Sequence, residues 1–332
     1  HRKLMIIDGK AAFTGGVNLA DEYINVPGSK NLNHWKDCGI RVEGGAAWSM
    51  TVMFLTMWDY VDRLEEDLNA FRPLPEPAPE GAHGWIQPFC DSPLDYEDVG
   101  ATVFQMLISS ASEKLWIMTP YLILDDKMTT ALCVAAKTGV DVRIITPGTP
   151  DKWYVHAVTR ANYEILTESG VRIFEYHPGF IHSKVCLSDD QYAVVGTVNM
   201  DFRSLYLHFE DAVYLSDCEA VLQVSRDFDA TFPECREITY ARCKHVYLHQ
   251  RLGLGQNFRR FRRHQADGVP QIMGNVPHGN HGVPVLCQMP HLIFPRNIGC
   301  GEHADYARQR FGFLRMDGQH PGPGILRANS TA

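Results

Sequence analysis

Three features are missing from this chain of 332 residues. No apolar run reaches the ~18 residues that a membrane-spanning helix needs, and no signal peptide opens the sequence. No Cys-x-x-Cys pair occurs among the nine cysteines, which favours reduced thiols in a cytosol-facing protein over a disulfide framework. The chain begins with histidine rather than methionine, and we expect it to be a fragment whose upstream part is missing.

Basic residues are scarce in most of the chain. The net charge is -8, and residues 243–332 hold ten Arg and one Lys against four acidic residues. Residues 1–242 therefore carry 20 basic against 35 acidic side chains. A general nucleic-acid-binding protein needs a basic surface to neutralise phosphates. We therefore expect no nucleic-acid partner.

One pattern of reactive residues occurs twice, at a constant offset of 181 residues. His, Lys, Asp, Gly and Asn recur at the same internal spacing, and one of the six matched positions differs. At a typical usage of ~5% per residue type, such a coincidence is very improbable. The repeat predicts two half-sites that share one substrate. The first copy is His1, Lys3, Asp8, Gly15, Gly16 and Asn18, and the second is His182, Lys184, Asp189, Gly196, Thr197 and Asn199.

Strand and helix patterns alternate along much of the chain, which favours an α/β fold with a sheet between helices. Each motif lies on an expected hairpin, so the His and Lys of one copy should point to the same side of their strand. The strands of these hairpins are expected at 3–7 and 11–14, and at 184–187 and 192–195. The other expected elements are helices at 46–60, 99–112, 126–138 and 155–169, and strands at 115–119, 140–146 and 171–176.

A proline-rich stretch divides the chain. Four prolines between residues 73 and 79 precede two glycines, which is typical of a linker. We therefore predict the C-terminal part of a first domain at 1–72, a linker at 73–84, a second domain at 85–242 and a tail at 243–332. The active site is expected at a pseudo-twofold interface between the two domains.

The predicted tail differs in composition from the rest. It holds eight of the fifteen His, twelve of the 27 Gly and seven of the 19 Pro, with no sustained helix or strand period. We interpret residues 243–332 as a basic tail that is disordered or artefactual, as a shifted reading frame would produce. The alternative is a basic arm in which residues 259–263 contact anionic lipid.

The duplicated residue types suit a phosphodiester substrate. Its anionic oxygens repel a nucleophile, so a catalyst must neutralise them and also supply a nucleophile and an acid. One imidazole can attack phosphorus to form a phosphohistidine, while the other protonates the leaving alcohol and later deprotonates the acceptor. The symmetric motif leaves the assignment open, and we favour His1 as the nucleophile and His182 as the acid and base. Hydrogen bonds to the non-bridging oxygens are expected from Lys3, Lys184, Asn18 and Asn199.

Carboxylates complete the predicted site. A carboxylate fixes the tautomer of a catalytic imidazole, and we assign Asp37 and Glu210, each on the segment after a hairpin, as orienting partners. Asp8 and Asp189 belong to the repeated catalytic motif. We interpret them as strand-ending residues that accept hydrogen bonds from N–H groups of the turns.

Segments around both motifs resemble the phospholipase D superfamily and, within it, the bacterial cardiolipin synthases. The similarity extends from residue 1 to about residue 239. The segments that carry it are 15–23, 35–37, 119–121, 139–144, 196–204 and 209–210.

This resemblance implies two phospholipase D-type domains, each a β-sheet sandwiched between helices, and a reaction without metal or other cofactor. One phosphatidylglycerol would give its phosphatidyl group to the enzyme with release of glycerol, and a second phosphatidylglycerol would accept it to form cardiolipin. The resemblance also implies a site at the bacterial cell membrane surface, with the catalytic domains facing the cytoplasm.

Three alternatives stay open. A phospholipase D-type phosphodiesterase would carry the same residues but use water as the acceptor, releasing phosphatidic acid. A nuclease of the superfamily is disfavoured by the acidic composition. A catalytically inactive fragment is compatible with a chain that begins at the first residue of a motif.

Overall fold

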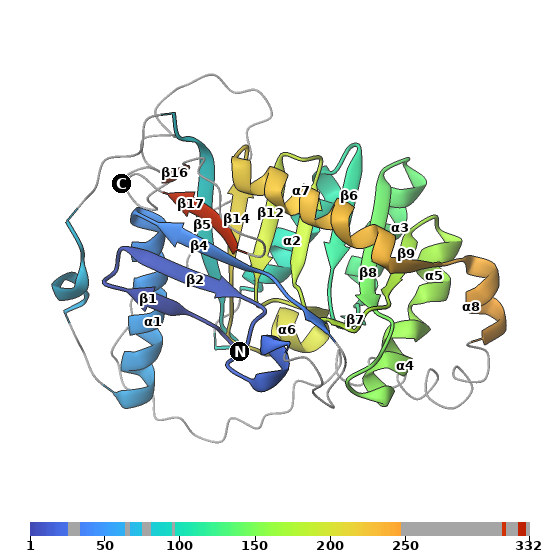
Figure 1. Cartoon of the computed structure of the whole chain (residues 1–332), viewed down its shortest axis with the longest axis horizontal. Coiled ribbons are helices and arrows are strands. Elements are labelled where there is room, and N and C mark those ends of the chain that lie inside the picture. The colour runs from blue at the N-terminus through green and yellow to red at the C-terminus, as the bar shows by residue number, and fades with distance from the viewer. Residues whose placement is uncertain are drawn as a thin grey trace.

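A large mixed β-sheet between helices forms the body of the protein, as the computed structural model shows (Figure 1). A smaller sheet carries the N-terminal segment and lies beside it. Helix α7 (Glu219–Thr231) crosses one face of the large sheet. The structure describes residues 1–25, 34–63, 67–74, 81–94, 97–246, 314–316 and 325–329.

Among these residues the large sheet has nine strands, and short parallel pairs tie distant segments together. The order in the large sheet is β15 (Cys235–Ile238), β9 (Arg172–Tyr176), β8 (Asp141–Pro147), β6 (Lys114–Met118), β11 (Val185–Ser188), β12 (Tyr192–Gly196), β14 (Glu210–Ser216), β5 (His83–Asp91) and β16 (Leu314–Met316). The smaller sheet is β1 (Met5–Ile7), β2 (Ala11–Gly15), β4 (Gly39–Glu43) and β17 (Ile325–Asn329). The pairs are β3 (Trp35–Lys36) with β10 (Phe180–Ile181), and β7 (Leu122–Ile123) with β13 (Met200–Asp201).

The helices connect these strands. The α-helices besides α7 are α1 (Gly45–Asp62), α2 (Val99–Ser110), α3 (Asp126–Lys137), α4 (Trp153–Ala161), α5 (Tyr163–Glu168), α6 (Phe202–Tyr206) and α8 (Tyr240–Val246). The described part of the chain also forms three short 3-10 helices: η1 (Asp21–Ile24), η2 (Leu68–Phe71) and η3 (Phe232–Glu234).

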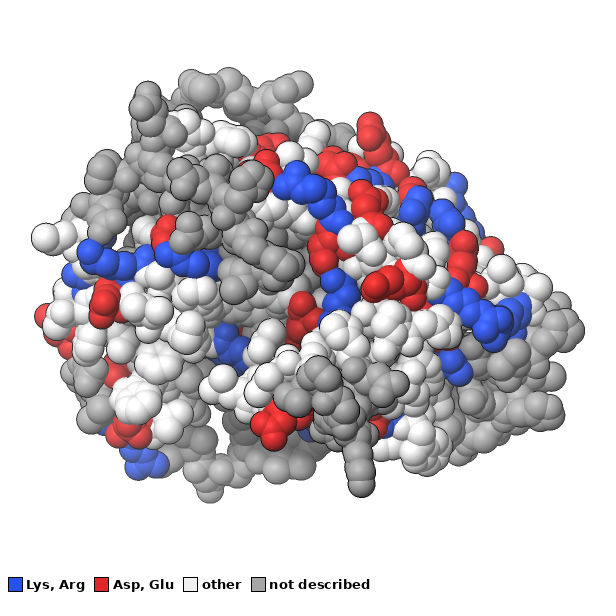
Figure 2. Space-filling model, in the orientation of Figure 1, with Lys and Arg blue, Asp and Glu red and all other residues white. Residues whose placement is uncertain are grey.

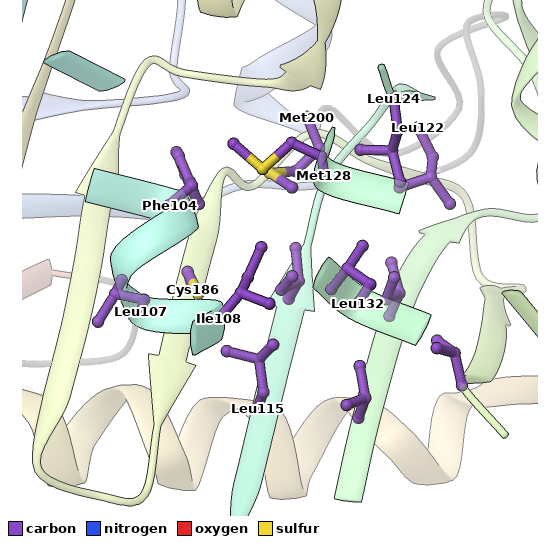
Figure 3. Packing of buried hydrophobic residues seen from close by; sticks show 14 of the residues in the cluster. Phe104, Leu107, Ile108, Leu115, Leu122, Leu124, Met128, Leu132, Cys186 and Met200 are labelled. Carbon is purple, nitrogen blue, oxygen red and sulfur yellow. The ribbon is translucent and has the colours of Figure 1, made fainter. Parts of the chain in front are cut away.

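Strands of the large sheet are apolar on both faces, because helices cover both. Alternate residues of β6 illustrate this: Leu115 and Ile117 pack toward α2 and α3, whereas Trp116 and Met118 pack toward α7. Figure 3 shows side chains of the first of these two cores, in which α2 and α3 lie over the strands.

The second core joins the two sheets. Ala12, Ile40 and Val42 of the smaller sheet are fully buried in the same cluster as Val195 and Val213 of the large sheet. Burial of apolar surface of this kind contributes roughly 25 cal/mol per Å². The shared core therefore fixes the position of the first hairpin relative to the second.

Both predicted hairpins are confirmed. Strands β1 and β2 pair antiparallel with Met5 opposite Phe13, and β11 and β12 do so with Val185 opposite Val195. Asp8 and Asp189 lie in the two turns with positive φ angles of 54° and 52°. The turns lie at the end of each hairpin that is remote from the histidine. The structure therefore does not bring these two aspartates, which the motif had grouped with the catalytic residues, to the histidines.

The other predicted elements agree with the structure, with one correction. The single helix expected at 155–169 is two helices, because Asn162 interrupts it. The buried Asn162 amide donates hydrogen bonds to the carbonyls of Leu122 and Val158, at 2.9 and 3.1 Å. A side chain that bonds to backbone groups in this way competes with helix continuation.

Parts of the predicted linker and tail lie outside the described residues. Residues 75–80 of the linker do so, and β5 begins at His83. Of the tail, the described residues form the end of α8 and the strands β16 and β17, while the basic residues 259–263 are outside them. Within the described part of the chain no helix is long and apolar enough to cross a bilayer.

Charged side chains are mixed on the face seen in Figure 2, where Lys and Arg lie among Asp and Glu rather than in one basic stripe. Ion pairs contribute to this mixing. The pairs include Lys36 with Asp227, Arg143 with Asp141, and Arg172 with Glu237.

Asp189 anchors the second hairpin to the start of β6. Its carboxylate accepts hydrogen bonds from the backbone N–H groups of Ser112, Glu113 and Lys114, at 2.8 to 2.9 Å. Partial burial opposes ionisation, but these N–H donors outweigh it and lower the pKa of Asp189.

We predict that Asp189→Asn lowers the free energy of unfolding by about 1–2 kcal/mol at neutral pH, because charge-assisted hydrogen bonds are lost. A carboxyl whose pKa is depressed on folding stabilises above its unfolded pKa, so the difference from wild type should shrink below about pH 4. Chemical denaturation at several pH values measures this difference in the free energy of unfolding. Asp8→Asn, an exposed aspartate with the same backbone conformation, is the matched control. An equal loss of stability in both variants would contradict the role of Asp189 as the residue that anchors the second hairpin.

Candidate functional site

Each motif histidine is held by a carboxylate from the other copy of the motif. Nδ1 of His1 lies 2.8 Å from Oε2 of Glu210, and Nδ1 of His182 lies 2.8 Å from Oδ2 of Asp37. Both carboxylates are buried, with side-chain exposures of 0% for Glu210 and 5% for Asp37. The two orienting partners named from the sequence thus contact the histidines, and they do so across the copies.

Backbone pairing explains this exchange. The backbone N–H of His182 donates to the carbonyl of Lys36 at 2.7 Å, where β10 leads into the motif beside β3. The amino group of His1 donates in the matching way to the carbonyl of Phe209, also at 2.7 Å. In each case the acceptor directly precedes the carboxylate residue. Each histidine therefore lies beside the opposite copy's carboxylate.

The two lysines contribute positive charge to the same cluster. Lys184 is buried, its Nζ lies 2.9 Å from Nδ1 of His182, and it also donates to the His182 carbonyl. Nζ of Lys3 donates to the His1 carbonyl at 2.6 Å. The Asp37 carboxylate can accept a proton that Nδ1 of His182 carries, whereas the Lys184 ammonium cannot.

Burial and charge shift the ionisation of these groups. Burial lowers the pKa of Lys184 to about 8, while Asp37 opposes the shift and Lys3 adds to it. Burial likewise lowers the pKa of Lys3, against the attraction of Glu210, Asp211 and Asp37. Each lysine thus interacts with a carboxylate beside the other copy's histidine as well as its own. The two motifs form one electrostatic cluster.

The two asparagines have matching partners that sequence reasoning missed. Nδ2 of Asn18 donates to the hydroxyl of Tyr23 at 2.6 Å, and Nδ2 of Asn199 donates to the hydroxyl of Ser204 at 3.1 Å. Tyr23 and Ser204 are related by the same offset of 181 residues as the motifs. Extending the repeat by five residues would have found both.

The position that differs between the copies also has a structural explanation. A Cβ on Gly16 would lie 2.1 Å from Oδ1 of Asp37, so any larger residue would displace that carboxylate. At the matching position, the Thr197 hydroxyl donates to Glu210. The longer Glu side chain is thus held by a hydroxyl, whereas the shorter Asp requires the space that glycine leaves.

A buried aspartate, Asp211, accepts hydrogen bonds from residues of the first hairpin. Asp211 follows Glu210 and accepts hydrogen bonds from the Thr14 hydroxyl and, at 3.3 Å, from the backbone N–H of Lys3. Burial raises the pKa of Asp211 to about 6, although these bonds oppose the shift. Nothing in the repeat pointed to this residue, because the matching residue in the first copy is Cys38.

The surroundings of the two histidines differ. His182 is 7% exposed, and the rings of Tyr23, Trp35 and Phe180 lie within 6.0 Å of its ring, measured between centroids. Burial lowers the pKa of His182, Asp37 raises it, and Lys184 lowers it further. His1 is more exposed, and a second imidazole, that of His208, lies beside it with ring centroids 5.6 Å apart.

His1, His208 and Glu210 bring three ligand-type atoms within 4.8 Å of one another. Glu210 is already engaged by His1 and by Thr197, which stabilise the carboxylate without an ion. We therefore describe these three residues as an acid–base cluster in which His1 is hydrogen-bonded to Glu210 and His208 lies within ion-pair distance of it.

The site lies where several strands end at one edge of the large sheet. Strands β6 and β8 run parallel, and β12 runs in the same direction because β11 is antiparallel to both β6 and β12. Their C-terminal ends meet beside His182 and Lys184, which precede β11. The arrangement can hold an anionic group between two imidazoles and two ammonium groups, because the carboxylates contact the rings at Nδ1 and not at Nε2.

The chain is similar to known proteins in sequence. Residues 105–232 match the family model described as "Cardiolipin synthase, PLD-like domain". An "Uncharacterized protein" of Streptococcus mutans serotype c is 45% identical over 241 residues, which are 72% of this chain and 51% of that protein. "Cardiolipin synthase 2" of Bacillus anthracis is 38% identical over 253 residues, or 76% of this chain and 48% of that protein.

Among solved structures, the phosphatidylserine synthase of Haemophilus influenzae superposes with a TM-score of 0.56 at 16% sequence identity, covering 80% of this chain and 69% of that one. This likeness supports the fold alone. The chain spans about half the length of the curated relatives that it matches.

We predict that NMR of ¹⁵N-labelled histidine can show which carboxylate contacts which motif histidine. Asp37→Asn should lower the pKa of His182 further, because Asp37 raises it in the native protein. The ring resonances of His1 should stay in place in that variant and move instead in Glu210→Gln. A response of His1 to Asp37→Asn, with His182 unchanged, would show that each carboxylate serves its own copy.

Proposed function

We propose that this chain, which belongs to the phospholipase D superfamily and contains a PLD-like cardiolipin synthase domain, transfers a phosphatidyl group between two phosphatidylglycerol molecules. The products are cardiolipin and glycerol, and a phosphohistidine is the intermediate. The observation that carries the proposal is the pair of motif histidines, each bound through Nδ1 to a buried carboxylate of the other copy. Carboxylates at Nδ1 leave both Nε2 atoms available to one phosphate.

In the first half-reaction, Nε2 of His1 attacks phosphorus. The N–P bond forms as the bond from phosphorus to the glycerol oxygen breaks, and His182 as imidazolium gives its proton to the departing alkoxide. Asp37 stabilises the charged imidazolium before this transfer. Glycerol then leaves, with His182 neutral.

In the second half-reaction, neutral His182 removes the proton from a hydroxyl of the second phosphatidylglycerol. That oxygen attacks phosphorus, the N–P bond breaks, and His1 is regenerated. Lys3, Lys184, Asn18 and Asn199 donate hydrogen bonds to the non-bridging oxygens throughout. Asn199 is suited to this because one amide hydrogen remains after the bond to Ser204.

A lipid substrate is supported by exposed apolar side chains next to the site. Val17 and Leu19 flank Asn18, Leu207 precedes His208, and Trp153 and Tyr154 begin α4 just after β8. Each lies on a segment that follows a strand ending at the edge of the site. We propose that they contact the bilayer surface that supplies the substrate, since exposed apolar groups mark interaction surfaces and Trp and Tyr favour membrane interfaces.

We propose that the protein acts at the bacterial cell membrane with its catalytic part facing the cytoplasm. The names of the curated relatives support the membrane lipid substrate. Water as acceptor would turn the same residues into a phosphodiesterase that releases phosphatidic acid, and the products distinguish the two.

We predict that the protein, incubated with phosphatidylglycerol vesicles and EDTA, forms cardiolipin and free glycerol, which mass spectrometry measures. EDTA should not reduce turnover, because no step uses a metal. Phosphatidic acid without cardiolipin would identify a hydrolase, and a requirement for a divalent ion would contradict the mechanism.

His1→Ala and His182→Ala are each expected to lower turnover by at least about 10³-fold, because residues that act as one unit fail together. Peptide mass spectrometry of protein quenched during turnover should locate the phosphatidyl adduct on His1. An adduct on His182 would reverse the roles, and substantial turnover in either variant would exclude the shared site. His177→Ala, an exposed histidine outside both motifs whose backbone N–H donates to the Glu234 carbonyl, is the matched control.

We predict that the double variant Trp153→Ser/Tyr154→Ser lowers turnover on vesicles about tenfold, because roughly 1.4 kcal/mol of membrane contact is lost. Turnover on a short-chain, monomeric phosphatidylglycerol should change less than about twofold. Trp58→Ser/Tyr60→Ser, an exposed pair of the same composition on α1, is the control. Equal losses on both substrates would mean that Trp153 and Tyr154 act within the site rather than at the membrane.

A further inference from the structure

The two half-sites differ chemically at one matched position beside each histidine. Two residues before Asp37 lies Trp35, whose ring centroid is 5.6 Å from that of His182. Two residues before Glu210 lies His208, whose ring centroid is also 5.6 Å from that of His1. His182 is thus accompanied by an indole, which cannot take up a proton near neutral pH. His1 is accompanied by an imidazole, which can.

His208 reaches the carboxylate that holds His1. Its Nδ1 lies 3.6 Å from Oε1 of Glu210, while His1 binds Oε2 of the same group at 2.8 Å. The Nδ1 atom of His208 is buried and has no hydrogen-bond partner among the described residues. A shift of less than 1 Å would close a hydrogen bond, whose usual length is about 2.9 Å.

Several charges surround His208. The ring of His1 and the carboxylate of Glu210 lie beside it, and Asp201 at the start of α6 interacts with it electrostatically. Around Glu210, Arg2 donates to its carbonyl at 3.1 Å, and Lys3 and Asp211 interact with its carboxylate. Glu210 is the carboxylate within ion-pair distance of both imidazoles. Two imidazoles therefore share one buried negative charge.

We propose that His208 is a positioning residue that shares Glu210 with His1 and carries the proton that Glu210 would otherwise hold on the His1 ring. The proposal rests on the proposed function, in which His1 attacks phosphorus. A buried carboxylate beside a single imidazole favours the imidazolium, which has no lone pair for attack. With His208 present, the same proton can be bound to His208, still neutralising Glu210, while Nε2 of His1 is free.

The proton count does not change in this exchange. Before it, His1 carries protons on both nitrogens and His208 is neutral. After it, His1 keeps only the proton on Nδ1, which is hydrogen-bonded to Glu210, and His208 is the imidazolium. The N–P bond then forms from the lone pair on Nε2 of His1, and no external base is needed.

The test is the pH dependence of kcat/KM on phosphatidylglycerol vesicles in His208→Asn. Without the second imidazole the proton stays on His1, so the acid limb should move to higher pH by roughly half to one unit. The rate on the plateau should change less than about threefold. His208→Trp, which copies the residue beside His182, should give the same shift, and His177→Asn should give none. An unchanged profile, or a loss that is equal at every pH, would overturn the proposal.

A second measurement needs no substrate. In ¹⁵N-histidine NMR titrations of the resting protein, His1 and His208 should titrate as a coupled pair in two steps, and His1 should titrate in one step in His208→Asn. Absence of lipid products together with this coupling would mean that the proposed function fails while the shared carboxylate stands. Cardiolipin formation without the coupling would mean that the proposed function stands while the shared carboxylate fails.

Discussion

The hydrogen bond between each motif histidine and the carboxylate of the other copy is the constraint on which the rest of the site depends. It requires that His182 lie beside Lys36 and that His1 lie beside Phe209, so neither half can orient its own imidazole. The parallel pairing of β3 with β10 and the apolar core shared by the two sheets meet this requirement. A site of this kind forms only when both halves are folded and docked.

That docking also carries an electrostatic cost. Lys184, Glu210 and Asp211 are almost completely buried, and burial shifts each toward its neutral form. Burying isolated charges would cost several kcal/mol each. The cluster offsets this with opposite charges and with the hydroxyls of Thr14 and Thr197. The apolar contacts between the sheets then supply the stability that the polar site does not.

The sequence predicted the hairpins and the histidines, lysines and asparagines, because a spacing repeated at one offset reports local structure directly. It named Asp37 and Glu210 but could not show that they are exchanged, since partner choice depends on how the halves dock. Asn162 interrupts a helix through contacts with Leu122, which lies on a distant segment that periodicity does not reveal. Asp211 escaped notice because its counterpart, Cys38, has different chemistry.

The proposed reaction requires the duplicated site to perform two different steps, one nucleophilic and one acid–base. The residues that would touch the phosphate are the same in both copies, so they cannot distinguish the two histidines. The differences lie in residues that contact the site residues rather than the phosphate. They are Gly16 against Thr197, Tyr23 against Ser204, and Trp35 against His208. The first two adapt the copies to carboxylates of unequal length and to different hydroxyls. The third changes which groups can hold a proton, and in the proposed reaction it therefore distinguishes the nucleophilic histidine from the acid–base histidine.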